Sequence, residues 1–148
     1  MIYRYPVTLK HDAQDGAYTA TFPDFPEAIT YGVSVDAALI AAIDALDEAL
    51  ASRVHGDEAI PPPSRIRKYA VEPSLLIAAK VALYETVAAA GIRKTWLARR
   101  LDVNENEVRR MLDPYHATKL SRIERALALL GKRLSITVVD VPAGKPAR

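Results

Sequence analysis

Residues 94–112 read K-T-W-L-A-R-R-L-D-V-N-E-N-E-V-R-R-M-L, and they decide how the second half of this chain folds. Apolar residues recur at helical spacing on both sides of a central break, which predicts two short amphipathic helices facing one shared core. These apolar positions are Leu97, Leu101, Val103, Val108 and Met111. Asp102 stands where the turn needs a left-handed residue, a conformation that Asp tolerates. Asn104 and Glu107 resemble a capping box, so the stretch predicts a helix-turn-helix.

The polar face of the second predicted helix suits DNA, because Asn and Arg side chains pair with base edges and with phosphates. The expected DNA-contacting residues are Lys94, Thr95, Asn104, Asn106, Arg109, Arg110 and Lys119, with Arg122 extending the backbone contacts. By comparison with other helix-turn-helix proteins, Asn104, Asn106 and Arg109 would face bases. Two alternatives stay open: Asn104 only caps the helix, or the arginines form a solvated face. Glu105 would repel phosphate unless it accepts a hydrogen bond from a cytosine amine.

The composition is that of an ordinary globular protein, with 50% hydrophobic and 26% charged residues among 148. The absence of cysteine excludes disulfides and thiolate metal sites. Charges interrupt the apolar runs, and the N-terminal residues lack the pattern of a signal peptide. We therefore expect a soluble, cytoplasmic protein without a membrane partner.

The two halves of the chain have opposite charge. Residues 1–64 contain three basic and ten acidic side chains, whereas residues 65–148 contain seventeen basic and eight acidic ones. The net charges are therefore −7 and +9. This division indicates two partners of opposite charge, although charged faces that only keep each half soluble remain an alternative.

The first half predicts a sheet covered on one face by a helix. Strands are expected at 3–11, 17–22 and 28–31, with an Asp15-Gly16 hairpin turn, followed by a helix from Ser34 to about Val54 and by Gly56. Pro6 predicts a free edge near the start of the first strand. The spacer I-P-P-P-S at 60–64 then predicts a boundary between two domains, 1–64 and 65–148.

The second half predicts a small helical bundle with one strand after it. Helices are expected at 75–90, over the two segments of 94–112, and from Leu120 to Leu130, with Gly91 and Gly131 after the outer two. Residues 65–71 could form one further strand. Leu134–Val141 reads as a lone strand, which must pair with 65–71 or with its equivalent in another copy. Pairing between copies would make a dimer, and the tail 142–148 is expected to be disordered.

The order of these pieces resembles the HicB antitoxins of bacterial toxin–antitoxin pairs over nearly the whole chain. In the first half the resemblance rests on D-G-A-Y-T-A-T-F-P-D-F-P (15–26), on Gly32 and on A-L-x-x-A-x-x-A-L from Ala38. In the second half it rests on 73–84 (P-S-L-L-I-A-A-K-V-A-L-Y), 97–103 (L-A-R-R-L-D-V), 110–113 (R-M-L-D), 116–120 (H-A-T-K-L) and 126–134 (A-L-A-L-L-G-K-R-L). Glu27-Ala28 departs from the frequent Gly-Cys, and Asp102 from the usual turn glycine.

The predicted elements give an α+β fold whose C-terminal helix-turn-helix bundle ends in a dimerising strand. The resemblance implies that the first half is a partial ribonuclease-H-like domain that lacks catalytic activity. It implies that the first domain blocks HicA, a small basic toxin that cleaves messenger RNA. It implies further that the second domain binds the operator as a dimer or tetramer and represses the toxin–antitoxin operon.

An acidic domain would suit a basic toxin, and an exposed surface with aromatic anchors would hold it. The candidate residues are Tyr18, Phe22, Asp24, Phe25 and Glu27, although either Tyr18 or Phe22 could instead lie in the core. No pattern of acids or histidines predicts a catalytic or metal site, so we expect neither enzyme activity nor a cofactor. Trp96 is expected in the bundle core. The alternatives are a transcriptional regulator whose first domain senses a small molecule, and a ribonuclease-H-type nuclease.

Overall fold

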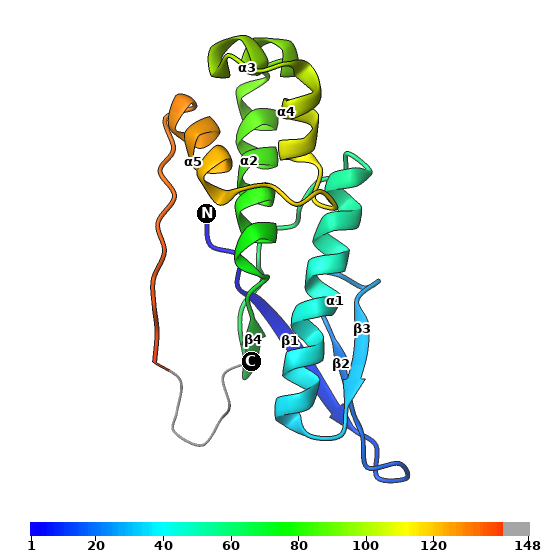
Figure 1. Ribbon diagram of the computed structural model, residues 1–148. Coiled ribbons are helices and arrows are strands. Elements are labelled where there is room, and N and C mark those ends of the chain that lie inside the picture. Colours follow the sequence, from blue (N-terminus) through cyan, green and yellow to red (C-terminus); the bar gives the residue numbers. More distant parts are fainter. Residues whose placement is uncertain (141–148) are drawn as a thin grey trace.

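The computed structural model describes residues 1–140 and has an α+β fold, as the sequence predicts (Figure 1). Its antiparallel sheet contains β1 (Tyr5–His11), β2 (Tyr18–Thr21), β3 (Ile29–Gly32) and β4 (Tyr69–Val71) in the order β3-β2-β1-β4. The first three strands lie within one or two residues of their predicted positions. β4 is the shortened form of the strand expected in 65–71, and it pairs with β1 although it follows the proline spacer.

β1 changes neighbours along its length. Residues Tyr5 to Val7 pair with β4, and pairing with β2 begins at Thr8. At Pro6, which has no N–H to donate, β1 therefore has a neighbour on one side only. The expected free edge near the start of the first strand is confirmed.

The helix α1 (Val35–His55) covers one face of the sheet (Figure 1). Its first turn is capped by Ser34, whose hydroxyl accepts a hydrogen bond from the N–H of Ala37 at 3.0 Å. The entry to α1 is tight, because a Cβ at Gly32 would lie 2.3 Å from the main-chain nitrogen of Ala38. At the other end Gly56 keeps a negative φ of −85°, and Asp57 instead takes the left-handed position with φ 53°.

The proline spacer is fixed to the sheet domain by hydrogen bonds. The hydroxyl of buried Tyr5 donates to the carbonyl of Pro61 at 2.8 Å, and Ser64 donates through its N–H and its hydroxyl to Asp24. Burial raises the pKa of Tyr5 to about 12, so the phenol stays protonated and remains a donor. The spacer therefore follows the surface of the first half.

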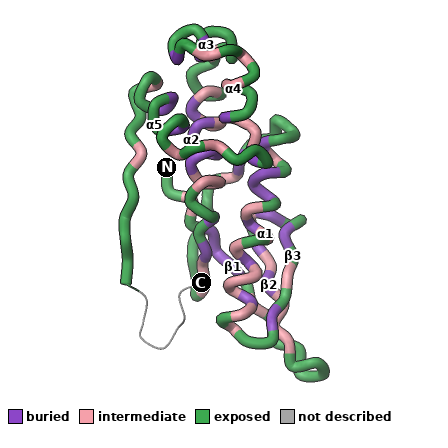
Figure 2. Tube along the Cα trace, in the orientation of Figure 1, coloured by how far each residue is buried: buried purple, intermediate pink, exposed green. Residues whose placement is uncertain are grey.

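The helix α2 (Leu75–Ala90) packs into two hydrophobic cores at once. Val81 lies in the core between α1 and the sheet, whereas Ala79 and Leu83 lie in the core of the helical bundle. Figure 2 shows the buried residues continuing along α2 from one half into the other. The two halves consequently share one helix, and a movement of α2 would displace side chains in both cores.

The remaining helices form the bundle at the far end of α2: α3 (Lys94–Leu101), α4 (Glu105–Leu112) and α5 (Leu120–Leu129). The predicted pair of short helices is present, and Asp102 takes the left-handed turn position with φ 55°. Gly91 also has a left-handed φ, of 63°, directly after α2. These residues set the tight angles between α2, α3 and α4.

The strand expected over Leu134–Val141 is not formed in residues 134–140, the part of it that the structure describes. Residues 134–140 run away from α5 without strand pairing, and Val141 with the tail 142–148 lies outside the described residues (Figure 1). The side chains of Ile136, Val138 and Val139 are 57, 92 and 72% exposed. A strand needs backbone partners from a neighbour, and within residues 1–140 this segment has no strand beside it.

Candidate nucleic-acid and partner interfaces

Three residues expected to contact DNA lie together on the outer face of α4. Asn106, Arg109 and Arg110 are exposed, and their spacing of three and four residues places them on one stripe of the helix. The opposite face holds the buried residues Val108 and Met111. The bundle core therefore presents this polar stripe outward, and these side chains can reach a groove or a phosphate.

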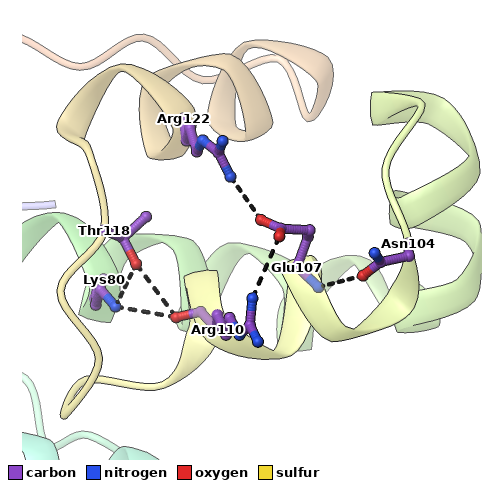
Figure 3. A network of polar contacts seen from close by, with 6 residues as sticks. All are labelled: Lys80, Asn104, Glu107, Arg110, Thr118 and Arg122. Atoms are coloured by element: carbon purple, nitrogen blue, oxygen red, sulfur yellow. Dashed lines mark hydrogen bonds and ion pairs between the residues drawn. The ribbon is translucent and has the colours of Figure 1, made fainter.

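Asn104 is the N-cap of α4. Its side-chain oxygen accepts a hydrogen bond from the N–H of Glu107 at 2.9 Å, so the expected cap is present (Figure 3). The carboxylate of Glu107 does not complete a capping box, because it pairs with Arg110 and Arg122. Asn104 is exposed, and its amide carries, besides the capping oxygen, an NH₂ group with two donors of the kind that base recognition uses.

The arginines of α4 are paired with carboxylates of the same helix. Arg109 lies 2.9 Å from Glu105, and Arg110 lies 3.4 Å from Glu107. All four side chains are partly or largely solvent-exposed, and exposed ion pairs of this kind contribute only about 0.2–1 kcal/mol. A nucleic-acid phosphate can therefore compete for both guanidinium groups.

The first turn of α3 offers further polar groups. Lys94 and Thr95 are exposed, as expected, and within residues 1–140 Arg93 provides no side-chain cap for this helix. The prediction for Trp96 is wrong: its side chain is 39% exposed, and the guanidinium of Arg100 lies 5.2 Å from its ring centroid. The indole lies on the surface because Leu97, Ala98 and Leu101 already fill the inner face of α3.

Lys80 is a completely buried lysine that holds the end of α4, a feature that the sequence analysis missed. Its ammonium donates to the carbonyl of Arg110 and to the hydroxyl of Thr118 (Figure 3). It donates also to the carbonyls of Asp113 and His116, so three N–H donors serve four oxygens. Burial lowers the pKa of Lys80, and the nearby charge of Asp113 opposes that shift. A lysine within the apolar run 75–83 was the available sequence signal.

The α4–α5 loop, residues 113–119, also contacts the sheet domain. The Tyr115 hydroxyl donates to the carboxylate of Glu48 on α1 at 2.9 Å, and its ring packs edge-on against His55. The same loop is thus joined to α2 through Lys80 and to α1 through Tyr115. It connects the end of α4 to the first half of the protein.

Two of the five expected partner-facing residues lie in the core. Phe22 and Phe25 are 2 and 0% exposed, and Phe25 packs edge-on against Tyr5 with ring centroids 4.9 Å apart. The prediction of Phe25 as an exposed anchor is therefore wrong, and the alternative that Phe22 lies in the core is confirmed. Both rings turn inward because they bury apolar surface in the core between the sheet and α1, which also contains Tyr5 and Leu46.

The other three expected residues lie at the surface, but they already have partners within the chain. Tyr18 packs against His11, Asp24 accepts hydrogen bonds from Ser64, and Glu27 pairs with Arg53 at 2.7 Å. The hydrogen bond from Arg53 lowers the pKa of Glu27. These contacts fix the surface of the first half and leave Tyr18 and Glu27 partly accessible.

A different apolar surface is open in the first half. We call it the edge stripe: Ile29, Tyr31 and Val33, which alternate along and just after β3 and are 64, 72 and 83% exposed. β3 is an edge strand of the sheet, and α1 covers the opposite face. The alternation I-T-Y-G-V at 29–33 was the sequence signal for this stripe.

The described part of the chain contains no group of three His, Asp or Glu side chains that could hold a metal ion. Among residues 1–140, no single helix is long and apolar enough to cross a membrane. Only α2 and α3 taken together, across a 113° bend, reach that length and composition.

The comparisons with known proteins place this fold in one class, the antitoxins of bacterial toxin–antitoxin systems. A family model described as the HicB-like antitoxin of bacterial toxin–antitoxin systems matches residues 4–82. Antitoxin HicB of Escherichia coli strain K12 is 38% identical over 138 residues, which cover 92% of this chain and 99% of the relative. Antitoxin HicB 1 of Photorhabdus laumondii is 33% identical over 135 residues, covering 91% and 86%. This chain belongs to the HicB antitoxin family.

Proposed function

We propose that this antitoxin neutralises a HicA-type messenger-RNA-cleaving toxin by direct binding and represses its own operon by binding operator DNA. The observation that supports the DNA-binding role is the exposed stripe Asn106, Arg109 and Arg110 on α4. The α3–α4 unit acts as a helix-turn-helix, with Lys94, Thr95 and Lys119 contacting phosphates around it. Asn104 caps α4 and also presents its amide to the DNA.

The toxin docks on the first half, in this proposal, because a basic toxin is attracted by a region whose net charge is −7. The edge stripe supplies exposed apolar anchors that the buried Phe22 and Phe25 cannot supply, and Tyr18, Asp24 and Glu27 form the polar surroundings. The strand edge of β3 also offers backbone groups for pairing. Binding there occludes the toxin's active site; the partial ribonuclease-H-like domain itself has no activity.

Self-association uses the segment that begins at Leu134. Its exposed side chains Ile136, Val138 and Val139, and its lack of a strand partner within residues 1–140, support pairing with a second copy. The division into 1–64 and 65–148 then describes two tasks, toxin binding and operator binding, joined by the shared helix α2. We propose that both tasks are carried out in the cytoplasm, where the DNA and messenger RNA are.

The experiment separates the two tasks with paired variants. The neighbouring gene is expressed alone and with this chain; growth arrest that this chain relieves supports neutralisation. Arg109→Ala with Arg110→Ala should abolish the gel shift of DNA from upstream of the operon and leave rescue intact, because both side chains are exposed and far from the edge stripe. Tyr31→Asp should weaken rescue and leave the gel shift intact.

The oligomeric state and the activity of the purified protein test the remaining parts of the proposal. Deletion of 134–148 should convert dimers to monomers in analytical ultracentrifugation. A neighbouring gene without toxicity would contradict the antitoxin–toxin pairing proposed here, and metal-dependent RNA cleavage by the purified chain would support the nuclease alternative. Loss of both functions in the arginine variant, with an unchanged circular-dichroism melting curve, would contradict the assignment of tasks to the two halves.

A further inference from the structure

Glu107 lies between two arginines that come from different helices (Figure 3). One carboxylate oxygen accepts from Arg110, one turn further along α4, at 3.4 Å. The other oxygen accepts from Arg122, in the first turn of α5, at 2.5 Å. One carboxylate in the first turn of α4 therefore joins this helix to the first turn of α5.

The arginines keep most of their hydrogen-bonding capacity. Their side chains are 57 and 53% exposed, whereas that of Glu107 is only 28% exposed. A guanidinium has five N–H donors, and each arginine uses one of them on Glu107. The carboxylate lies deeper, and the two cationic groups remain available to an anion above it.

These side chains line a hollow of about 200 Å³ at the surface of the bundle. Its lining also contains Lys119 and the hydroxyl-bearing Thr118. The two arginines and Lys119 together outweigh the charge of Glu107 by two positive charges. A hollow of this size and sign suits one phosphate group.

We propose that Glu107 is a positioning residue, which holds Arg110 and Arg122 side by side so that they and Lys119 bind one phosphate of the DNA backbone. This inference rests on the proposed DNA-binding function. Without the carboxylate, the two like charges repel each other and sample many rotamers. Ordering them on a phosphate would then cost conformational entropy that the present arrangement avoids.

The alternative role for Glu107 predicts a change of opposite sign. If the carboxylate only competes with phosphate, its removal would strengthen DNA binding, because an acidic group leaves a DNA-facing surface. Glu105 provides the matched control: it lies on the same helix and pairs with Arg109 alone, four residues away. Glu105→Ala removes the same negative charge but breaks no contact between α4 and α5.

The experiment measures the affinity of the full-length protein for a DNA duplex from upstream of its own coding region, over a series of salt concentrations. Glu107→Ala should weaken binding by about fivefold or more, and the slope of log affinity against log salt should fall by about one. Glu105→Ala should bind as tightly as the unmodified protein or more tightly. Arg122→Ala should cost less affinity in the Glu107→Ala background than in the unmodified protein.

Each outcome decides a separate question. If the unmodified protein does not bind this duplex, both the proposed DNA-binding function and the positioning role of Glu107 are contradicted. If it binds and Glu107→Ala binds equally or more tightly, DNA binding stands and the positioning role is overturned. Glu107→Gln, which keeps the shape of the side chain, replaces the Ala variant if the melting temperature of the latter drops.

Discussion

Two loops of this protein are fixed by opposite physical means. The proline loop, residues 22–28, is fixed by burying Phe22 and Phe25 between the sheet and α1. The α4–α5 loop, residues 113–119, is fixed by one buried cation, Lys80, which gathers main-chain carbonyls and the Thr118 hydroxyl. The hydrophobic burial of the two phenylalanines has no preferred direction. The Lys80 ammonium, in contrast, stabilises its loop only if the oxygens around it lie at hydrogen-bonding positions.

The difference teaches where each half can tolerate change. A loop held by apolar burial can shift slightly without losing its stabilisation, because the hydrophobic effect depends on area. A loop held by a buried ammonium cannot shift without losing stabilisation, because every misplaced carbonyl becomes an unsatisfied buried group. The position of the C-terminal end of α4 is therefore constrained more tightly than that of the proline loop. Such a constraint suits a helix that we propose to contact DNA.

The largest expected effect comes from removing the apolar anchor. Phe25→Ala should lower the free energy of unfolding by about 3–5 kcal/mol, because it removes a fully buried ring and leaves a cavity. Chemical denaturation measures this change, and hydrogen exchange should rise chiefly in β1, β2 and the proline loop. Tyr31→Ala, at a side chain that is 72% exposed, is the control and should change stability by less than about 0.5 kcal/mol.

The next effect comes from removing the polar anchor. Lys80→Met keeps the length of the side chain but leaves its buried oxygen partners without that donor, which should cost about 2–4 kcal/mol of unfolding free energy. Hydrogen exchange should rise in residues 113–119 and leave the proline loop protected. Lys132→Met, at an exposed lysine, is the control. Equal stability of Lys80→Met and the unmodified protein would show that the network does not hold the loop.

The sequence predicted the parts of the fold that local chemistry determines. Asp102 was expected at a left-handed position, Gly91 at the end of a helix, and Asn104 as a possible cap, because each depends on backbone conformation and a few neighbours. The pairing of β4 with β1 was not predicted, since the proline spacer suggested that a new domain begins after it. Long-range strand pairing is not encoded in any short segment.

The site was predicted less completely, and Phe25 and Lys80 show why. Phe25 was predicted as a surface anchor from its place in the proline-framed loop, although Phe is usually buried. A lysine, by contrast, is usually exposed, so the average behaviour of this residue type gave no sign that Lys80 is buried. Burial of each depends on partners far along the chain, Tyr5 for the ring and residues 110–118 for the ammonium. Glu107 was assigned to a capping box from its spacing to Asn104. Its pairing with Arg122 could not be seen in that short pattern, because Arg122 lies fifteen residues further along the chain.

The smallest expected effect concerns a third anchor, which is ionic and exposed. Arg53 on α1 lies 5.1 Å from the ring centroid of Phe25 and pairs with Glu27, so it covers the proline loop from outside. Glu27→Gln should lower the free energy of unfolding at neutral pH by about 0.2–1 kcal/mol, because the pair is partly solvated. Added salt should reduce this difference further.

The pH dependence of that difference identifies its cause. The Arg53 hydrogen bond lowers the folded-state pKa of Glu27, so the pair stabilises the fold above the ordinary carboxyl pKa of about 4.3. This stabilisation is lost as the pH falls through the folded-state pKa. Denaturation curves of the unmodified protein and Glu27→Gln should therefore converge in acid and separate towards neutral pH. A difference that stays constant over this range would mean that Glu27 supports the loop by packing and not by charge, which would align this third anchor with Phe25.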